Sequence, residues 1–439
     1  MREKYLINPA IIGGGYAGMA AAVTLAARGV PVTVFESAKQ LGGRARGVWH
    51  NDTQLDNGQH ILLGCYRHTL NLIEQVGGDI ERDFLRLPLQ LTLHKLFELK
   101  AAHLPAPFHL LAGLLTAHGL SLAQRLAAVR LMLAMRRIKF TLPQDTSALD
   151  LLRAHQQDDM LIRLLWQPIC ISALNTPLHK ASAQILLNVL RDSLNGARSN
   201  SDMLLPRVDF STLFPDRAAE YVKRYGGTVL TACAVEALIP HGEQIELVTA
   251  QACPEHGRRG SQRFSHVICA ASPTAAARLL RTTPQLETVA QQIDAITHQP
   301  IYTVYLQYPP QVRLPHPMLG LDQCYTQWLF DKGQIAEQHG LIAAVISAEG
   351  IHQELEHEQL AQRVMQELRD QLGIMEAPLW HKVIAEKRAT FSCEVNLLRP
   401  AQATPLANVL LAGDYTRGEY PATLEGAVIN GIMAAQAVA

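Results

Sequence analysis

A glycine-rich motif near the N-terminus has the residue types and the spacing of a dinucleotide-binding turn. Gly13, Gly15 and Gly18 follow an apolar run at residues 10–12 and open a stretch rich in alanine and leucine. Gly13 permits a tight turn, Gly15 lets the backbone approach a pyrophosphate, and Gly18 lets a helix pack closely on a strand. Ala17 lies at the start of the expected helix, where free N–H groups and partial positive charge favour an anion.

An acidic residue completes this motif at the end of the next expected strand. Glu36 lies 18 residues beyond Gly18. Its carboxylate is suited to accept hydrogen bonds from an adenosine ribose, and it would repel a 2′-phosphate. A glycine pattern alone also fits an ordinary turn. The strand, turn, helix, second strand and acidic residue in register predict a dinucleotide site.

The elements that position this motif are α/β segments at the start, the middle and the end of the chain. The first of them are a strand at 10–12, a helix at 19–28 that ends at Gly29, and a strand at 30–35. Later strands are expected at 227–238, 244–250, 266–271, 302–308, 341–347 and 409–411, and a last helix from Leu424. Helical segments occupy 95–140 and 148–194, and residues 253–261 are expected to form a hairpin tip.

This order predicts one nucleotide-binding domain that is assembled from separated segments and interrupted twice by a second domain. We assign residues 1–95, 196–275 and 385–439 to the first domain. Residues 96–195 and 276–384 form the second, substrate-binding domain, which has a helical part. A chain of 439 residues is long enough for two such domains.

Composition excludes several classes of protein. Lys plus Arg and Asp plus Glu both number 39, so the net charge is 0, which argues against a nucleic-acid partner. A hydrophobic content of 48% with 18% charged residues excludes a disordered chain. The seven cysteines are scattered without a C-x-x-C pair, so we expect neither a metal site nor a disulfide framework. We expect a cytoplasmic protein, because the first apolar run leads directly into the glycine turn and does not read as a targeting segment.

Four further motifs distinguish FAD from NAD as the dinucleotide. They are Leu41-Gly42-Gly43-Arg44, Asp56-Asn57-Gly58-Gln59-His60, Leu411-Ala412-Gly413-Asp414 and Glu425-Gly426-Ala427. Together with the glycine turn, they resemble the flavoprotein superfamily that contains amine oxidases, phytoene desaturases and protoporphyrinogen oxidase. The resemblance implies an α/β fold, with a Rossmann-like FAD-binding domain of the glutathione-reductase type and a mixed α+β substrate domain.

The same resemblance implies a role for each motif in holding FAD. Gly43 and Arg44 would lie against the diphosphate and the flavin, Asp414 beside Gly413 would bind the ribityl or diphosphate chain, and Val235 would meet the adenine. Gly58 and Gln59 would run beside the flavin, and the helix that begins at Leu424 would point its N-terminus at the flavin. We expect non-covalent FAD, because Cys393 is not where amine oxidases attach the flavin.

Two departures count against amine oxidation. Thr423 occupies a position where amine oxidases usually carry an aromatic residue, and no lysine occurs between Lys223 and Lys332, where a flavin-contacting lysine is expected. The chain instead resembles the hydroxysqualene dehydroxylases of bacterial hopanoid synthesis. The segments that carry this resemblance are residues 56–60, 64–66, 173–177, 181–184, 187–194 and 421–427.

That resemblance implies reductive removal of the allylic hydroxyl of hydroxysqualene to give squalene, with reduced FAD as the hydride source. The departing hydroxyl needs a proton donor, and His60 is the candidate because histidine donates and accepts protons near neutral pH. A structural histidine bonded to a backbone carbonyl or to the flavin is the alternative. An oxidative flavoprotein of the same fold, either a carotenoid or phytoene-type desaturase or an amine oxidase, remains open, as does an escort protein that has lost its flavin.

The partners follow from this chemistry and from one charge asymmetry. The substrate would be an isoprenoid lipid, and the electron donor stays unknown. No acidic residue occurs between Glu98 and Asp145, a stretch with six basic residues and a helix-competent segment at 122–140. Basic and apolar residues together suit an anionic membrane surface, so we expect peripheral contact with the inner leaflet.

Overall fold

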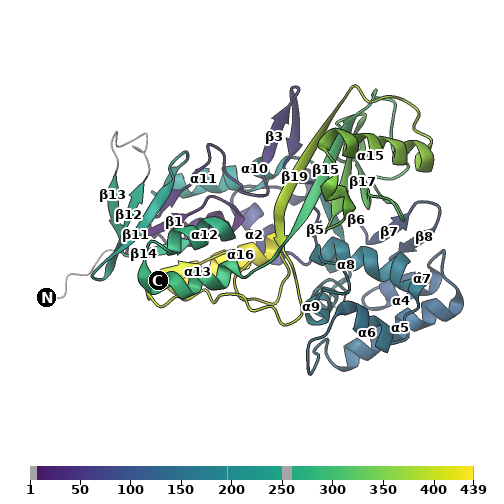
Figure 1. The fold of residues 1–439 in the computed structure, drawn as a ribbon, viewed down its shortest axis with the longest axis horizontal. Coiled ribbons are helices and arrows are strands. Elements are labelled where there is room, and N and C mark those ends of the chain that lie inside the picture. Colours follow the sequence, from purple (N-terminus) through teal and green to yellow (C-terminus); the bar gives the residue numbers. More distant parts are fainter. Residues whose placement is uncertain (1–6, 195, 250–259, 439) are drawn as a thin grey trace.

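The computed structural model describes residues 7–194, 196–249 and 260–438 (Figure 1). The expected hairpin tip at 253–261 lies almost entirely outside them. A five-stranded parallel sheet in the order β10-β2-β1-β14-β20 forms the centre of one part of the molecule. Its strands are β1 (Pro9–Ile12), β2 (Thr33–Phe35), β10 (Thr228–Leu230), β14 (His266–Cys269) and β20 (Val409–Leu411).

Helices cover one face of this sheet. Alternate residues of each strand point to opposite faces, so every second strand residue packs on these helices. Ile11 and Val34 belong to a core shared with α1 (Tyr16–Ala27) and α16 (Leu424–Val438). The two helices pack closely, since a Cβ added to Gly431 of α16 would lie 2.1 Å from the carbonyl oxygen of Ala17. The other helices around this core are α2 (Arg67–Gln75), α3 (Ile80–Asp83), α10 (Phe210–Leu213) and α11 (Pro215–Arg224).

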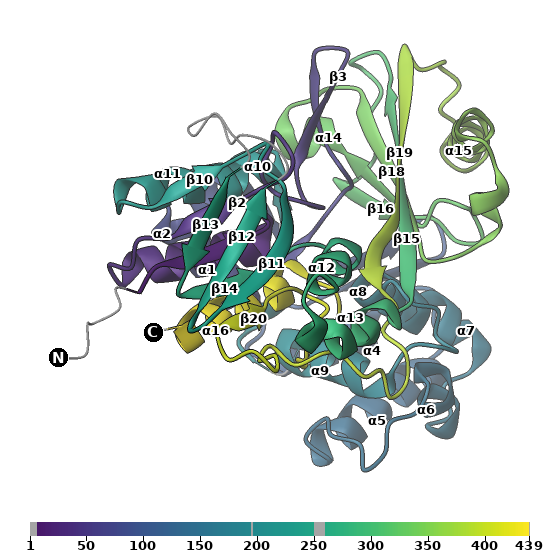
Figure 2. The same cartoon turned by 60° about the vertical axis from the view of Figure 1, so that its left-hand side comes forward.

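A three-stranded antiparallel sheet lies against the other face (Figure 2). It consists of β11 (Val235–His241), β12 (Gln244–Thr249) and β13 (Ser261–Phe264). Ala10 and Ile12 of β1 share a core with Leu238 and Leu247 from this sheet. The pair α12 (Pro273–Leu280) and α13 (Glu287–Asp294), linked by η3 (Pro284–Leu286), packs beside it.

The second part of the molecule contains a seven-stranded mixed sheet in the order β19-β15-β18-β17-β16-β7-β8. Its strands are β7 (Gln90–Leu93), β8 (Phe97–Lys100), β15 (His298–Gln307), β16 (Met318–Gly320), β17 (Trp328–Asp331), β18 (Leu341–Ser347) and β19 (Trp380–Phe391). One face packs on α15 (His357–Leu372), since Tyr302 and Val304 share a core with Leu360 and Val364. The opposite face of β15 is therefore free to line an interior space. Shorter elements of this part are α14 (Lys332–Ala336) and η4 (Ile351–Glu354).

A cluster of helices extends from this sheet to the end of the molecule far from the parallel sheet (Figures 1 and 2). It consists of α4 (Phe108–Thr116), α5 (Leu122–Arg137), α6 (Ala148–Ala154), α7 (Asp159–Leu161), η1 (Ile162–Trp166), α8 (Gln167–Leu174) and α9 (Ala183–Leu194). Two small sheets join the parts: β3 (Gly47–His50) with β4 (Thr53–Asp56), and β5 (Leu62–Leu63) and β6 (Phe84–Leu87) on either side of β9 (Met203–Pro206), which follows η2 (Arg198–Ser201).

The predicted α/β class with a second mixed part is confirmed, and the strands at 341–347 and 409–411 have the predicted bounds. The segment 227–238, predicted as one strand, is two strands in different sheets. The predicted cuts at 95 and 385 pass through the seven-stranded sheet, because β7 pairs with β8 and β19 spans residue 385. The division into domains stays a proposal. To keep paired strands in one domain, we place its boundaries before β7 and after β19.

Candidate cofactor and substrate site

A cavity of about 1100 Å³ lies between the parallel sheet and the seven-stranded sheet. Its wall contains every predicted site residue except Gly18. These are Gly13, Gly15, Ala17, Glu36, Gly43, Arg44, Gly58, Gln59, His60, Val235, Gly413, Asp414 and Leu424. Segments from the beginning, the middle and the end of the chain therefore meet at one site, as the sequence predicts.

The glycine turn has the geometry that its sequence implies. Gly13 has a φ of +110°, and an added Cβ would lie 2.6 Å from the carbonyl oxygen of Ala270, the residue after the neighbouring strand β14. Gly18 lies outside the cavity because it serves packing: its Cβ would lie 1.9 Å from the carbonyl oxygen of Gly13. A Cβ on Gly15 meets its nearest neighbour only at 3.9 Å, so the backbone there is open to a ligand. Within the described residues, no side chain caps the N-terminus of α1 at Gly15.

Glu36 holds this turn in place. The carboxylate is buried, and it accepts hydrogen bonds from the backbone N–H of Gly14 at 2.7 Å and of Ala38 at 2.7 Å. The hydroxyl of Ser37 donates to it at 3.2 Å. These bonds fix the carboxylate at the edge of the cavity. Its contact with a ribose stays a prediction.

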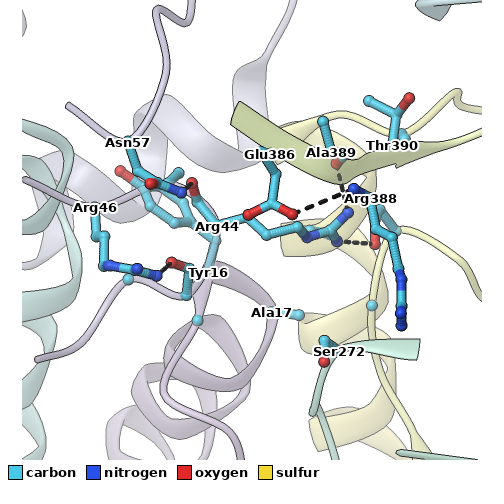
Figure 3. A pocket seen from close by; sticks show the side chains of 18 of the residues that line it. Tyr16, Ala17, Arg44, Arg46, Asn57, Ser272, Glu386, Arg388, Ala389 and Thr390 are labelled. Carbon is cyan, nitrogen blue, oxygen red and sulfur yellow. Dashed lines mark hydrogen bonds and ion pairs between the residues drawn. The ribbon is translucent and has the colours of Figure 1, made fainter. Parts of the chain in front are cut away.

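Arg44 ties three segments together at the cavity wall (Figure 3). One nitrogen of its guanidinium forms an ion pair with Asp414 at 2.6 Å, and another donates to the carbonyl oxygen of Ala389 on β19 at 2.7 Å. Gly43, with a φ of +61°, turns the chain just before it. Charges of both signs therefore face the cavity where the resemblance expects a diphosphate and a ribityl chain.

The segment at 57–60 forms another part of the wall, and His60 is held within it. The ring Nδ1 of His60 lies 3.0 Å from the carbonyl oxygen of Gly58, and the ring packs on Phe210 with 4.8 Å between centroids. Burial lowers the pKa of His60 to about 4, and the Arg44 guanidinium contributes to this lowering. The neutral ring donates through Nδ1 to Gly58, which leaves Nε2 as an acceptor. The role of His60 as a proton donor stays a prediction.

The N-terminus of α16 faces the same cavity. Thr423, which lines the cavity, caps the helix by accepting the backbone N–H of Gly426 at 3.1 Å. Glu425 points away to cap a different helix: its carboxylate accepts the backbone N–H groups of His68 and Thr69 at the start of α2, at 3.0 and 2.9 Å. The Glu-Gly-Ala motif therefore connects α16 to α2, and Leu424 remains in the wall.

The wall contributed by the second part of the molecule has an apolar stretch that sequence reasoning missed. This stretch and its polar neighbours are Ile171, Ser172, Ala173, Asn175, Ile301, Met318, Trp328, Phe330, Val345 and Ser347, whereas β19 adds a polar side with Glu386, Lys387, Arg388 and Thr390. Trp328 and Phe330 lie two residues apart, as do Val345 and Ser347, so each pair shares one face of its strand. That period of two was the available signal, but the sequence did not show which face would be enclosed.

The residues present fit a dinucleotide that carries a flavin. The uncapped start of α1 suits a diphosphate, and Val235 at the start of β11 lines the cavity where an adenine is expected. Three residues of the wall carry a buried polar atom without a protein partner among the described residues: Oε1 of Gln59, Nε2 of His298 and Oη of Tyr415. Buried polar atoms are normally satisfied, so these atoms indicate a polar ligand.

Residues 16–439 match the family model of the flavin-containing amine oxidoreductases. The chain belongs to that family. Among curated proteins, it is 28% identical to a hydroxysqualene dehydroxylase of Sinorhizobium fredii, over 98% of this chain and 97% of that protein. A hydroxysqualene dehydroxylase of Zymomonas mobilis is 26% identical, with 97% of each chain covered. A zeta-carotene desaturase of Synechocystis is 24% identical, over 98% of this chain and 96% of that protein.

Solved structures share the fold over nearly the whole chain. An oxidoreductase from Methanosarcina mazei has a TM-score of 0.75 at 15% identity, covering 98% of this chain and 100% of that one. A putative protoporphyrinogen oxidase from Exiguobacterium has a TM-score of 0.70 at 16% identity, covering 98% of both chains. The predicted resemblance to hydroxysqualene dehydroxylases is confirmed. The protein is a FAD-dependent oxidoreductase.

Proposed function

We propose that this enzyme removes the allylic hydroxyl of hydroxysqualene reductively to give squalene, in hopanoid or squalene synthesis. The observation that carries the proposal is the apolar wall beyond the flavin segment, where Ile301, Met318, Trp328, Phe330 and Val345 line the cavity. Such a wall suits a long hydrocarbon with one polar atom. The whole-chain likeness to two hydroxysqualene dehydroxylases supports the same substrate class.

FAD, bound non-covalently and reduced by a donor that the sequence does not identify, would supply the hydride that replaces the hydroxyl, which leaves as water. The chain's own residues have three tasks. Gly15 and the start of α1 bind the diphosphate, with Arg44 and Asp414 beside it. The apolar wall excludes water, which would otherwise restore the hydroxyl. His60 is the polar group of this wall that we assign to the hydroxyl oxygen.

The role of His60 as proton donor stays a proposal, and it requires that the ring becomes protonated when substrate binds. With a pKa of about 4, only about one ring in a thousand is protonated at pH 7. Donation from His60 therefore requires the ring to gain a proton in the substrate complex. Without that proton, Nε2 accepts a hydrogen bond from the hydroxyl and orients it.

An oxidative reaction, with hydride moving from substrate to flavin, is the second candidate. The whole-chain likeness to a zeta-carotene desaturase favours it, because an apolar wall suits a carotenoid precursor equally well. Amine oxidation fits less well. The side chain of Thr423 is engaged in capping α16, and β15 contains no lysine.

One anaerobic experiment separates these reactions. The flavin of the purified holoenzyme is photoreduced, hydroxysqualene is added, and the oxidised flavin band is followed while extracted lipids are assayed for squalene. Return of the band with an equal amount of squalene supports dehydroxylation. A reduced flavin that ignores hydroxysqualene but reoxidises promptly with dioxygen or a quinone would support the oxidative reaction instead.

We also propose that the enzyme is cytoplasmic and takes its isoprenoid substrate from the inner leaflet through the α4–α5 surface. This surface comprises the exposed apolar residues Leu104, Phe108, Leu115, Leu122, Leu126, Leu133 and Ile138. On α5, Leu122, Leu126 and Leu133 share the outward face, whereas Ala128 and Leu131 are buried. Five basic residues at 125–139 accompany them, and such a surface suits anionic lipid. Among the described residues, no helix is long and apolar enough to cross a bilayer.

Vesicle sedimentation tests this contact without any enzyme assay. The holoenzyme should sediment with vesicles that contain phosphatidylglycerol and much less with pure phosphatidylcholine. The double variant Leu126→Asp/Leu133→Asp should lose this binding, whereas Leu398→Asp, at a more exposed apolar residue outside this surface, should keep it. Equal sedimentation of all three proteins would refute the assignment of the surface.

A further inference from the structure

Phe210 contacts residues on two sides of the cavity. Its ring packs on His60, and its backbone carbonyl accepts a hydrogen bond from the hydroxyl of Tyr16 at 3.0 Å. Tyr16 is the first residue of α1 and lines the cavity beside the glycine turn. Phe210 itself is fully buried. Its position therefore affects both the histidine wall and the start of α1.

Asp56 fixes this phenylalanine from the other side. It is the last residue of β4, directly before the cavity segment at 57–60, and only 4% of it is exposed. One carboxylate oxygen accepts the backbone N–H of Phe210 at 2.9 Å. The backbone carbonyl of Asp56 accepts the hydroxyl of Tyr305, on β15 of the seven-stranded sheet, at 3.0 Å. Asp56 therefore connects the flavin side of the molecule to the substrate side.

We propose that Asp56 is a positioning residue that holds the His60 ring in the cavity wall through Phe210. The inference rests on the proposed function only where turnover is measured. A negatively charged side chain is costly to bury, and here the carboxylate has one backbone N–H as partner and the attraction of a buried lysine. That lysine is Lys332, the first residue of α14, which is only 5% exposed.

Charged and polar groups from several elements act on the pKa of Asp56. Burial raises the pKa of Asp56 to about 6, Lys332 and the Phe210 N–H lower it, and Asp209 raises it. Burial raises the pKa of the Tyr16 and Tyr305 phenols, and the charge of Asp56 raises both further. Asp56 is thus charged at neutral pH and accepts the Phe210 N–H as a carboxylate, which is a stronger acceptor than a neutral group.

The first test uses the full-length holoenzyme and measures the chemical reactivity of one residue. Diethyl pyrocarbonate modifies neutral histidine, and peptide mass spectrometry gives the rate at His60, with the exposed His179 as an internal standard. Asp56→Ala should raise the His60 rate severalfold, because the freed Phe210 no longer covers the ring. Asp56→Asn retains an oxygen that can accept the Phe210 N–H and should stay near the wild-type rate. Asp216→Ala removes a nearby carboxylate without a bond to Phe210 and is the matched control.

Turnover by the holoenzyme provides the second readout. Asp56→Ala should lower the rate about tenfold or more at unchanged FAD content. The same change in a His60→Ala background should have no further effect. An unaltered His60 modification rate, or equal losses in both backgrounds, would overturn the proposal. If Asp56→Ala does not fold, Phe210→Leu provides the same test. It keeps the backbone bonds and removes the ring contact, so it should raise the modification rate of His60 but not that of His179. Failure of hydroxysqualene as a substrate would leave the modification result intact.

Discussion

Arg44 and Asp414 lie 370 positions apart in the chain, and their side chains form an ion pair of 2.6 Å at the wall of the cavity. The same guanidinium binds the carbonyl oxygen of Ala389 on β19. This pair connects the Gly-Gly-Arg turn, the end of the parallel sheet and the seven-stranded sheet. Two motifs that are recognisable separately in the sequence thus function as one unit.

Asp414→Ala should therefore lower FAD affinity by about tenfold or more, because a partly buried charge-assisted bond is lost and Arg44 loses its carboxylate partner. FAD content after dialysis, measured by absorbance, gives the result. Asp414→Asn keeps one acceptor for Arg44 and should lose less flavin. Full FAD occupancy in the alanine variant would exclude Asp414 from the cofactor site.

Two glycines of the same turn should respond differently to alanine. A Cβ on Gly18 would lie 1.9 Å from the Gly13 carbonyl oxygen, so Gly18→Ala should lower the free energy of unfolding by about 1–3 kcal/mol. A Cβ on Gly15 would meet its nearest neighbour, the Cα of Gly43, only at 3.9 Å, so Gly15→Ala should fold normally and bind FAD more weakly. Urea unfolding of the apoproteins and FAD titration separate the two effects. Equal behaviour of both variants would contradict the assigned roles.

The flavin side of the site was predictable because its residues lie in short local motifs. Gly13 and Glu36 each follow directly on an apolar strand, Asp414 lies in the turn after another, and parallel strands end at one edge of a sheet. The strands at 341–347 and 409–411 were predictable because they are continuous apolar runs. The order of these residues along the sheet edge then follows from the order of their strands in the sheet.

The substrate side was not predictable for reasons of tertiary structure. β19 carries the exposed residues Lys382, Lys387 and Arg388, and its sequence has no apolar alternation to mark it as a strand. It forms because it pairs with β15 along most of its length. The lowered pKa of His60 was also not predictable from the sequence. It results from burial and from the nearby charge of Arg44, and neither can be read from the order of residues.

Glu425→Gln should destabilise the protein, although Glu425 is part of a family motif beside the cofactor. Both carboxylate oxygens accept backbone N–H groups at the start of α2, so an amide NH₂ would oppose one of these donors. A loss of about 1–3 kcal/mol in the free energy of unfolding is expected. Glu220→Gln, at an exposed surface pair on α11, is the control and should have little effect. A stable variant with reduced FAD binding would assign Glu425 to the cofactor instead.

Asp56 should make stability depend on pH in a defined direction. Its folded pKa of about 6 lies above the usual value near 4, so the folded state binds the proton more tightly. This contribution is fully present below the unfolded pKa and is lost as pH rises through about 6. As pH rises from about 4 to about 6, the free energy of unfolding of the wild type should therefore fall relative to that of Asp56→Asn. A constant difference in urea unfolding across this range would show that Asp56 does not titrate there.

The pH dependence of turnover decides what His60 does. If His60 donates the proton to the departing hydroxyl, its low pKa means that turnover should rise as pH falls toward about 4, since the protonated ring becomes more abundant. If Nε2 only accepts a hydrogen bond, turnover should instead be flat near neutral pH and fall as the ring becomes protonated. His60→Ala should keep its flavin and lose most turnover in either case. His60→Gln distinguishes the roles further, because glutamine can accept a hydrogen bond but cannot carry the proton. Normal activity of the alanine variant would leave His60 with a structural role only.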